Sequence, residues 1–183
     1  MKLVVLAGPA GVGKGTLVKW ITSHDPDFML SVSATTRSPR PAEIDGVHYH
    51  FITKDVFEAG IEQGEFLEWA QVHNLNYYGT PRSELARANS LGKHLLLEID
   101  LQGARQVAQS HPEAISIFIS PPSWEELEAR LRNRATETES EIQTRLATAR
   151  MELDASSEFD FELVNDSLEI CAKEIIRIVK EAT

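Results

Sequence analysis

Seven residues near the start of the chain have the composition of a phosphate-binding loop. Residues 8–14 read Gly-Pro-Ala-Gly-Val-Gly-Lys and lie between a strand-like stretch and a helix-like stretch. Glycines let backbone N–H groups approach phosphate oxygens closely, and the start of the following helix adds a partial positive charge. Lys14 is placed to reach the β- and γ-phosphates, so the motif predicts a site for a nucleoside triphosphate. The residues expected at this ligand are Gly8, Pro9, Ala10, Gly11, Val12, Gly13, Lys14, Gly15 and Thr16.

The position after the lysine departs from the usual motif. A Ser or Thr normally follows there and binds magnesium, whereas this chain has Gly15 and places Thr16 one residue later. Mg²⁺ keeps several waters and is commonly held through substrate phosphates. We therefore assign no residue as a direct ligand of the ion. We expect the ion to be bound through phosphates and water near Gly15, Thr16 and Glu98. The order Gly-Lys-Gly-Thr resembles the loops of nucleoside monophosphate kinases.

Apolar runs along the chain predict the sheet that must carry this loop. Strands are expected over 2–7, 95–100, 115–119 and 161–165, and helices from 16, from about 101, from 123 and over about 167–182. Ser123 and Glu126 have the spacing of a capping box at the start of one of these helices. Strands with apolar residues on both faces, alternating with helices, predict an α/β fold with a mostly parallel central sheet flanked by helices.

The segment over about 31–80 has a different pattern. Short alternating stretches at 31–33 and 48–52 are surrounded by turn-forming residues at 38–41 and 45–46. This pattern predicts a small insertion with a mixed or antiparallel sheet, and we expect this insertion to bind a substrate.

Composition and charge limit the partners. The 183 residues carry a net charge of −10, which argues against a broad face for binding DNA or RNA. The single cysteine, Cys171, excludes a disulfide within the chain, and its place on the apolar side of a helical pattern predicts a small buried side chain. Neither a signal peptide nor an apolar run long enough to cross a bilayer is found, so we expect a cytosolic protein that does not bind membranes.

Several motifs of the middle segment strongly resemble the guanylate kinase family. They are Val-Ser-Ala-Thr-Thr-Arg-Ser-Pro-Arg at 32–40, Glu43 and Gly46, Tyr-His-Phe at 49–51, Gly-Glu-Phe-Leu-Glu-Trp at 64–69 and Asn-Tyr-Tyr-Gly-Thr at 76–80. Together with the phosphate loop, the resemblance covers nearly the whole chain. Ala42 stands where the family usually has Gly, and the turn at 73–76 is one residue longer than the commonest form.

The resemblance implies a site for GMP. Arg37 and Arg40 would grip the monophosphate through charge-assisted hydrogen bonds, with phenolic donors from Tyr49 and Tyr78. Glu68 would accept from guanine N1–H and the 2-amino group, and Ser33 and Thr80 would contact the base through their hydroxyls. The run at 95–100 resembles the second acidic strand of the family, which places Asp100 at the guanine or ribose and Glu98 near magnesium or the base.

A mobile lid is also implied by the resemblance. Arg134 and Arg145 match the catalytic lid arginines of the family, and Arg130 is the next candidate to stabilise the charge of the transferred phosphoryl group. Asn165 is expected to face the adenine of ATP. The expected single domain spans 1–183, with a core of 1–30, 81–125 and 155–183, a GMP-binding subdomain over about 31–80 and a lid over about 126–154.

The resemblance implies an ATP:GMP phosphotransferase that also accepts dGMP and uses Mg²⁺ with ATP. Small nucleotides are the expected partners, without nucleic acid or membrane, and the oligomeric state is left open. One alternative is another nucleoside monophosphate kinase or a related sugar-phosphate kinase, which the set Ser33, Glu68 and Tyr78 disfavours. A second alternative is a guanylate-kinase-like binding module without catalysis, which the presence of Lys14, Arg134 and Arg145 disfavours.

Overall fold

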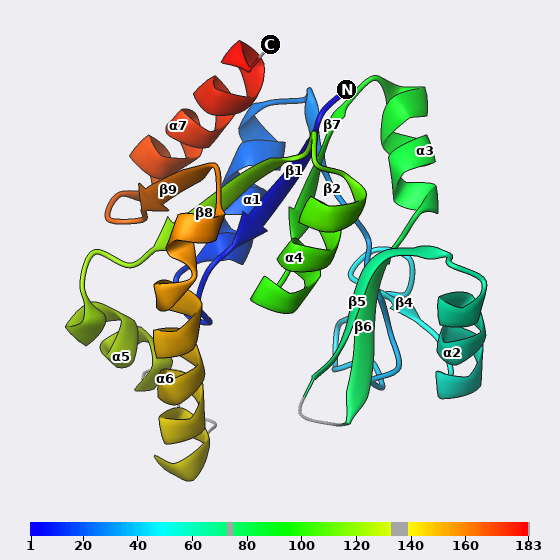
Figure 1. The fold of residues 1–183 in the computed structure, drawn as a ribbon, viewed down its shortest axis with the longest axis horizontal. Coiled ribbons are helices and arrows are strands. Elements are labelled where there is room, and N and C mark those ends of the chain that lie inside the picture. The colour runs from blue at the N-terminus through cyan, green and yellow to red at the C-terminus, as the bar shows by residue number, and fades with distance from the viewer. Residues whose placement is uncertain (73–74, 133–138, 183) are drawn as a thin grey trace.

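The computed structural model describes residues 1–72, 75–132 and 139–182, which form two sheets with helices around them (Figure 1). The strands are β1 (Leu3–Ala7), β2 (Phe28–Leu30), β3 (Ala34–Thr35), β4 (His50–Phe51), β5 (Phe66–Val72), β6 (Asn76–Pro81), β7 (His94–Glu98), β8 (Ile115–Ser120) and β9 (Phe161–Val164). The helices are α1 (Lys14–His24), α2 (Lys54–Glu62), α3 (Ser83–Leu91), α4 (Leu101–Ser110), α5 (Trp124–Arg132), α6 (Glu139–Asp154) and α7 (Leu168–Glu181), with a short 3₁₀ turn, η1, at Ser156–Glu158.

The larger sheet is parallel throughout, in the order β2-β7-β1-β8-β9. Side chains alternate across it, so that Val4 and Leu6 pack against α1, α5, α6 and α7, whereas Leu3 and Val5 pack against α3 and α4. Burial on both faces explains the continuous apolar runs of these strands and confirms the predicted α/β fold. Cys171 is buried in the first of these two clusters, as expected.

The smaller sheet has the order β4-β3-β6-β5 and differs in detail from the alternating pattern of the sequence. β3 pairs antiparallel with β6 but parallel with β4, because the connection over 36–49 is long enough to return the chain in the same direction. Residues 31–33 form no strand, although they belong to the alternating stretches of the sequence. The Val32 N–H instead donates to the Glu84 carboxylate at 2.8 Å, and the Ser31 N–H donates to the Leu96 carbonyl at 3.0 Å.

Polar side chains at the N-caps determine where several of the helices begin. The Asp100 carboxylate accepts from the Gly103 N–H at 2.8 Å and caps α4, and Ser123 accepts from the Glu126 N–H at 3.2 Å before α5. The Glu126 side chain pairs with Arg130 rather than with the cap backbone. Three helices, α2, α3 and α6, were not predicted from the sequence. The N-cap of α2 is Thr53, whose hydroxyl accepts from the Val56 N–H.

The two sheets and the helices frame one edge of the larger sheet (Figure 1). The smaller sheet and α2 lie at one side of this edge, and α5 and α6 lie at the other. Parallel strands end in the same direction, so the segments that follow β1 and β7 meet at this edge. Among the described residues, none of the helices combines the length and the apolar character needed to cross a bilayer.

Candidate active site

The phosphate loop follows β1 and has the backbone geometry expected of a loop that turns its N–H groups inward. Gly13 is the N-cap of α1 and has a φ of 101°, a conformation that glycine adopts without strain. A Cβ on Gly8 would overlap the carbonyl oxygen of Ile119 in β8. The Lys14 ammonium donates to the Gly8 carbonyl at 2.5 Å and to the Pro9 carbonyl at 3.3 Å, so Lys14 folds over the loop.

Two cavities share this loop. One of about 600 Å³ is lined by Pro9, Ala10, Gly11, Gly13, Lys14, Gly15, Thr16, Lys19 and Glu98. The other, of about 310 Å³, is lined by Gly8, Ala10, Lys14, Ser33, Tyr49, Glu68, Ala70, Val72, Tyr78, Gly79, Glu98, Ile99, Asp100 and Glu152. Ala10, Lys14 and Glu98 belong to both, so a ligand in one cavity would meet a ligand in the other beside Lys14.

Gly15, which stands where the usual motif has Ser or Thr, lies against Glu98. Both carboxylate oxygens of Glu98 lie 3.4 Å from the position that a Cβ on Gly15 would occupy. Burial raises the pKa of Glu98, and the nearby Lys14 ammonium opposes this effect. A carboxylate and the hydroxyl-bearing Thr16 thus lie on the wall of the phosphate-loop cavity. Oxygen donors beside a phosphate site are the set that suits Mg²⁺.

A third cavity, of about 500 Å³, lies on the other side of the loop. It is lined by Gly11, Gly13, Thr16, Arg130, Asn165, Asp166 and Leu168. The Asn165 amide donates to the Val12 carbonyl at 2.8 Å, and Arg130 donates to the same carbonyl at 3.2 Å. The Val12 side chain is buried in the core, so this residue can serve a ligand only through its backbone.

A cluster of side chains beside the smaller sheet is made by Arg37, Tyr49 and Tyr78. The Arg37 guanidinium lies 5.5 Å from the ring centre of Tyr49, and the rings of Tyr49 and Tyr78 are 6.0 Å apart. Both N–H groups of the Arg37 fork donate to Glu43 at 2.9 Å. The ion pair holds the pKa of Glu43 far below its usual value, at about 2, and raises that of Arg37. Burial raises the pKa of Tyr49.

The loop before Glu43 shows why the family usually has glycine there. Ala42 has a φ of 70°, the left-handed region that a side chain rarely adopts. This turn lets the Glu43 carboxylate accept from the Arg40 N–H at 2.6 Å as well as from Arg37. The Arg40 side chain is exposed and does not line the cavity beside Lys14.

Glu68 and Thr80 face each other across β5 and β6. The Thr80 hydroxyl donates to the Glu68 carboxylate at 2.6 Å, and both residues are buried. Burial raises the pKa of Glu68 to about 7, and the charge of Asp100 adds to the rise while Thr80 opposes it. Asp100 and Ser33 line the same cavity. The buried Glu68 therefore lines a space where a ligand with hydrogen-bond donors can bind.

Sequence reasoning missed Glu152 of α6. Its carboxylate lines the cavity beside Lys14 and accepts from the Ala10 N–H, and burial raises its pKa, although Lys14 opposes the rise. No local motif marks this residue, because only the packing of α6 brings it to the loop. Arg145, on the same helix, is half-buried and lies outside the residues lining these cavities. Arg134 lies outside the described residues.

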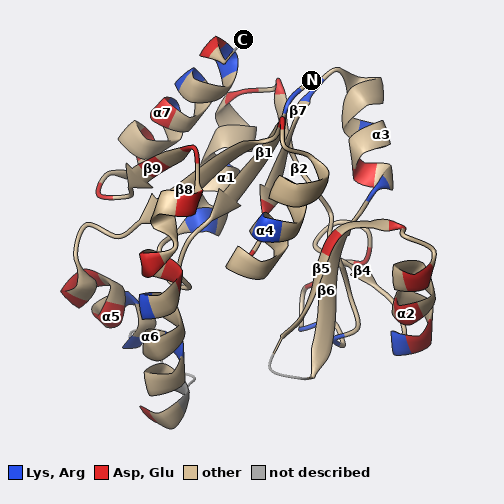
Figure 2. Cartoon of the chain, in the orientation of Figure 1, with Lys and Arg blue, Asp and Glu red and all other residues tan. Residues whose placement is uncertain are grey.

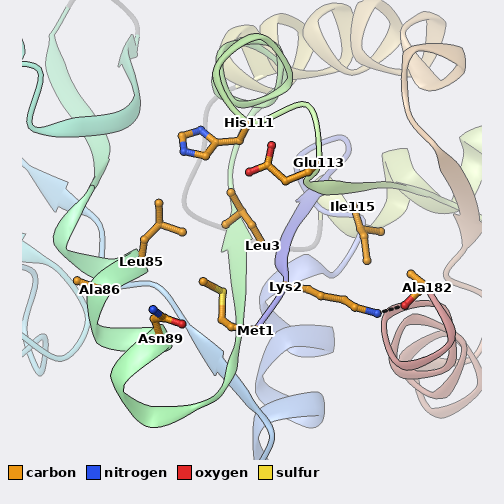
Figure 3. A pocket seen from close by; sticks show the side chains of 10 residues that line it. All are labelled: Met1, Lys2, Leu3, Leu85, Ala86, Asn89, His111, Glu113, Ile115 and Ala182. Carbon is orange, nitrogen blue, oxygen red and sulfur yellow. Dashed lines mark hydrogen bonds between the residues drawn. The ribbon is translucent and has the colours of Figure 1, made fainter.

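Another cavity, of about 440 Å³, lies at the far end of β1 (Figure 3). It is lined by Met1, Lys2, Leu3, Leu85, Ala86, Asn89, His111, Glu113, Ile115 and Ala182. The Lys2 ammonium, drawn in the same view, donates to the Ala182 carbonyl. Since the phosphate loop follows the opposite end of β1, this cavity contributes nothing to the site at Lys14.

A loop for a triphosphate and a cavity lined by two tyrosines and a buried carboxylate meet at one lysine, an arrangement that defines a P-loop kinase acting on a nucleotide. The family model for guanylate kinase matches residues 1–182. This chain belongs to the guanylate kinase family and is an ATP:GMP phosphotransferase.

Individual relatives agree with the family assignment. The guanylate kinase of Leifsonia xyli subsp. xyli is 52% identical over 177 residues, which cover 97% of this chain and 70% of the relative. That of Synechocystis sp. is 48% identical over 98% of this chain and 94% of the relative. The crystal structure of guanylate kinase from Anaplasma phagocytophilum superposes with a TM-score of 0.75 at 33% identity, covering 98% of this chain and 84% of that one.

Proposed function

We propose that this chain phosphorylates GMP, and also dGMP, with Mg²⁺-bound ATP in the cytoplasm, and thereby returns GMP to the purine nucleotide pool. The observation that carries the proposal is the sharing of Lys14 between the phosphate-loop cavity and the cavity that contains Glu68. A lysine between two nucleotide sites lies where the phosphoryl group must pass.

ATP would bind with its phosphates on the loop over 8–16 and its adenine beside Asn165. Mg²⁺ would be held by the phosphates, with Glu98 and Thr16, which both line the phosphate-loop cavity, as the nearby oxygen donors. When bound, the ion would neutralise charge on the β- and γ-phosphates. Lys14 would leave the Gly8 and Pro9 carbonyls and donate to the same phosphates.

GMP would bind in the other cavity with its base against Glu68 and its phosphate toward Arg37. Guanine presents N1–H and the 2-amino group side by side, and the ionised Glu68 offers two acceptors to this pair. Ser33, Thr80 and Asp100 would surround the base and ribose. Arg37, Arg40, Tyr49 and Tyr78 would hold the phosphate, with Arg37 kept in place by Glu43.

The reaction needs no general base, because the GMP phosphate is already an anionic nucleophile. One of its oxygens forms a bond to the γ-phosphorus of ATP, and the bond from that phosphorus to the β,γ-bridging oxygen breaks, which leaves GDP and ADP. Positioning and charge stabilisation can account for the rate. Arg130, Arg134 and Arg145 are the proposed sources of that charge, brought in by a lid over about 126–154.

The proposed units are the core, the lid and the GMP-binding subdomain over about 31–80, with closure excluding the water that would otherwise hydrolyse ATP. Acidic and basic residues are interleaved along α6 and α7 (Figure 2), and the net charge of the chain is −10. This distribution supports small nucleotides rather than nucleic acid as partners.

A coupled assay for ADP tests the proposal. Each of GMP, dGMP, AMP, CMP, UMP and ribose 5-phosphate is offered in turn with ATP and Mg²⁺. Rapid ADP formation is expected with GMP, and slower formation with dGMP. A preference for another acceptor would contradict the assignment of Glu68. ATP binding without turnover on any acceptor would instead indicate a binding module.

A further inference from the structure

The strand that carries Glu68 lies at the edge of its sheet, next to α4 of the core (Figure 1). β6 pairs with one side of β5. On the other side, the Trp69 N–H donates to the Gln106 amide oxygen at 3.1 Å, and the Gln106 amide nitrogen donates to the Trp69 carbonyl at 2.7 Å. A single side chain thus pairs with the backbone of β5 as a neighbouring strand would, directly after Glu68.

Gly103 lies one helical turn before Gln106, on the same face of α4. A Cβ on Gly103 would lie 2.5 Å from one carboxylate oxygen of Glu68, so the glycine makes room for that oxygen. Gly103 is also in the first turn of α4, where the helix has its positive end. The two residues therefore form a docking face, with Gly103 receiving the Glu68 side chain and Gln106 holding the adjoining backbone.

Glu68 depends on these contacts with α4 to keep its position. The residue is 4% exposed, and its contact with Thr80 lies within the same small sheet. Helix α4 belongs to the core, so its contacts with β5 connect Glu68 to the core. Hydrogen bonds to a base weaken steeply when donor and acceptor move out of line. A small displacement of β5 relative to α4 would therefore misalign both acceptors with the donors of guanine.

We propose that Gln106 is a positioning residue for base recognition, which fixes the Glu68 carboxylate against α4 by pairing with the backbone of Trp69. The inference rests on the proposed function, since it concerns how the GMP site reads the base. A residue that only supports the fold would affect both substrates alike. Substitution of Gln106 should change the KM for the nucleoside monophosphate and leave the KM for ATP unchanged.

Gln106→Met tests the proposal, because methionine keeps the length of the side chain and removes both hydrogen bonds. KM for GMP is expected to rise about tenfold or more, from the loss of two hydrogen bonds to partly buried backbone groups. KM for ATP should stay within about twofold of its original value. The preference for GMP over IMP, which lacks the 2-amino group, should shrink. Gln109→Met, on an exposed position of the same helix, is the matched control.

A second variant, Gln106→Glu, guards against a folding failure of the first. It keeps an acceptor for the Trp69 N–H and, when ionised, loses the donor to the Trp69 carbonyl. Because Glu68 is also protonated as the pH falls, which weakens GMP binding by every variant, the GMP defect is taken relative to the original protein at each pH. This relative defect should diminish as the pH falls and the new carboxyl is protonated. The proposal is overturned if folded Gln106 variants match Gln109→Met in KM for GMP and in base preference, or if KM for ATP rises equally. Failure of the original protein to phosphorylate GMP would overturn the proposed function instead.

Discussion

The phosphate loop and the GMP pocket are built in different ways. The loop is made by backbone: Gly13 supplies a left-handed φ, and Gly8 packs where no side chain fits. The GMP pocket is made by side chains that hold one another, through Glu43 on Arg37 and Thr80 on Glu68. A backbone site can be encoded in seven consecutive residues, whereas a side-chain site needs partners from several elements.

The largest expected effect separates the two regions by removing Lys14. Lys14→Ala should lower kcat by about 10²–10³ or more, because a charge aimed at the transferred phosphoryl group is lost. GMP affinity should stay within about twofold, since the GMP pocket has its own cations. Steady-state kinetics and GMP titration measure the two quantities. Lys173→Ala, which removes an exposed lysine of α7 that lines none of these cavities, is the control. Near-normal turnover of Lys14→Ala would contradict the phosphate-loop assignment.

Glu68→Gln tests the side-chain region. The amide offers one acceptor and one donor group in place of two acceptors, so one guanine donor loses its partner. kcat/KM for GMP should fall by about 10², from a lost charged hydrogen bond of about 2–3 kcal/mol. Activity on AMP should change little, and IMP should be a poor substrate for the original protein. An unaltered ratio of GMP to AMP activity would show that Glu68 does not read the base.

Glu43→Gln tests whether the side chains of the pocket hold one another. Losing the charged fork should release Arg37 from its place beside Tyr49, and KM for GMP should rise by about tenfold while KM for ATP stays unchanged. Glu62→Gln, exposed on α2, serves as the control in the same kinetic assay. A lower KM for GMP would mean instead that Glu43 competes with the phosphate for Arg37.

The last expected effect concerns the stability of the nucleotide-free protein rather than its kinetics. Burial raises the pKa of Glu68 from 4.5 to about 7, so the folded protein binds the proton more tightly than the unfolded chain does. The free energy of unfolding should therefore fall as the pH rises through this window. Glu68→Gln has no such titration and should be more stable than the original by about 2 kcal/mol above about pH 7, and not below about pH 4.5. Urea unfolding at both ends of the window measures the difference, and a constant difference would contradict the assigned burial effect.

The sequence predicted what local patterns determine. The phosphate loop, the parallel sheet and the buried Cys171 follow from glycine spacing and apolar runs, and the structure confirms the fold they indicate. The assigned roles of Arg40, Asn165 and Asp100 stay predictions, as does that of Arg134.

Contacts between residues far apart in the sequence determine the features that local sequence patterns did not predict. Residues 31–33 alternate like a strand, yet a carboxylate from α3 takes the Val32 N–H, which local pattern cannot foretell. No sequence motif marks Gln106 or Glu152. Gln106 meets the backbone of Trp69, and Glu152 reaches the cavity beside Lys14, only because of how α4 and α6 pack.

The carbonyl of Val12 has a consequence for transplanting the phosphate loop. Its hydrogen-bond donors, Arg130 and Asn165, come from positions 118 and 153 residues further along the chain. The heptapeptide over 8–14 is therefore not a portable module, although it reads as one. A host scaffold that received it alone would leave this oxygen without two of its donors, and grafting should succeed only where α5 and the segment after β9 are carried over as well.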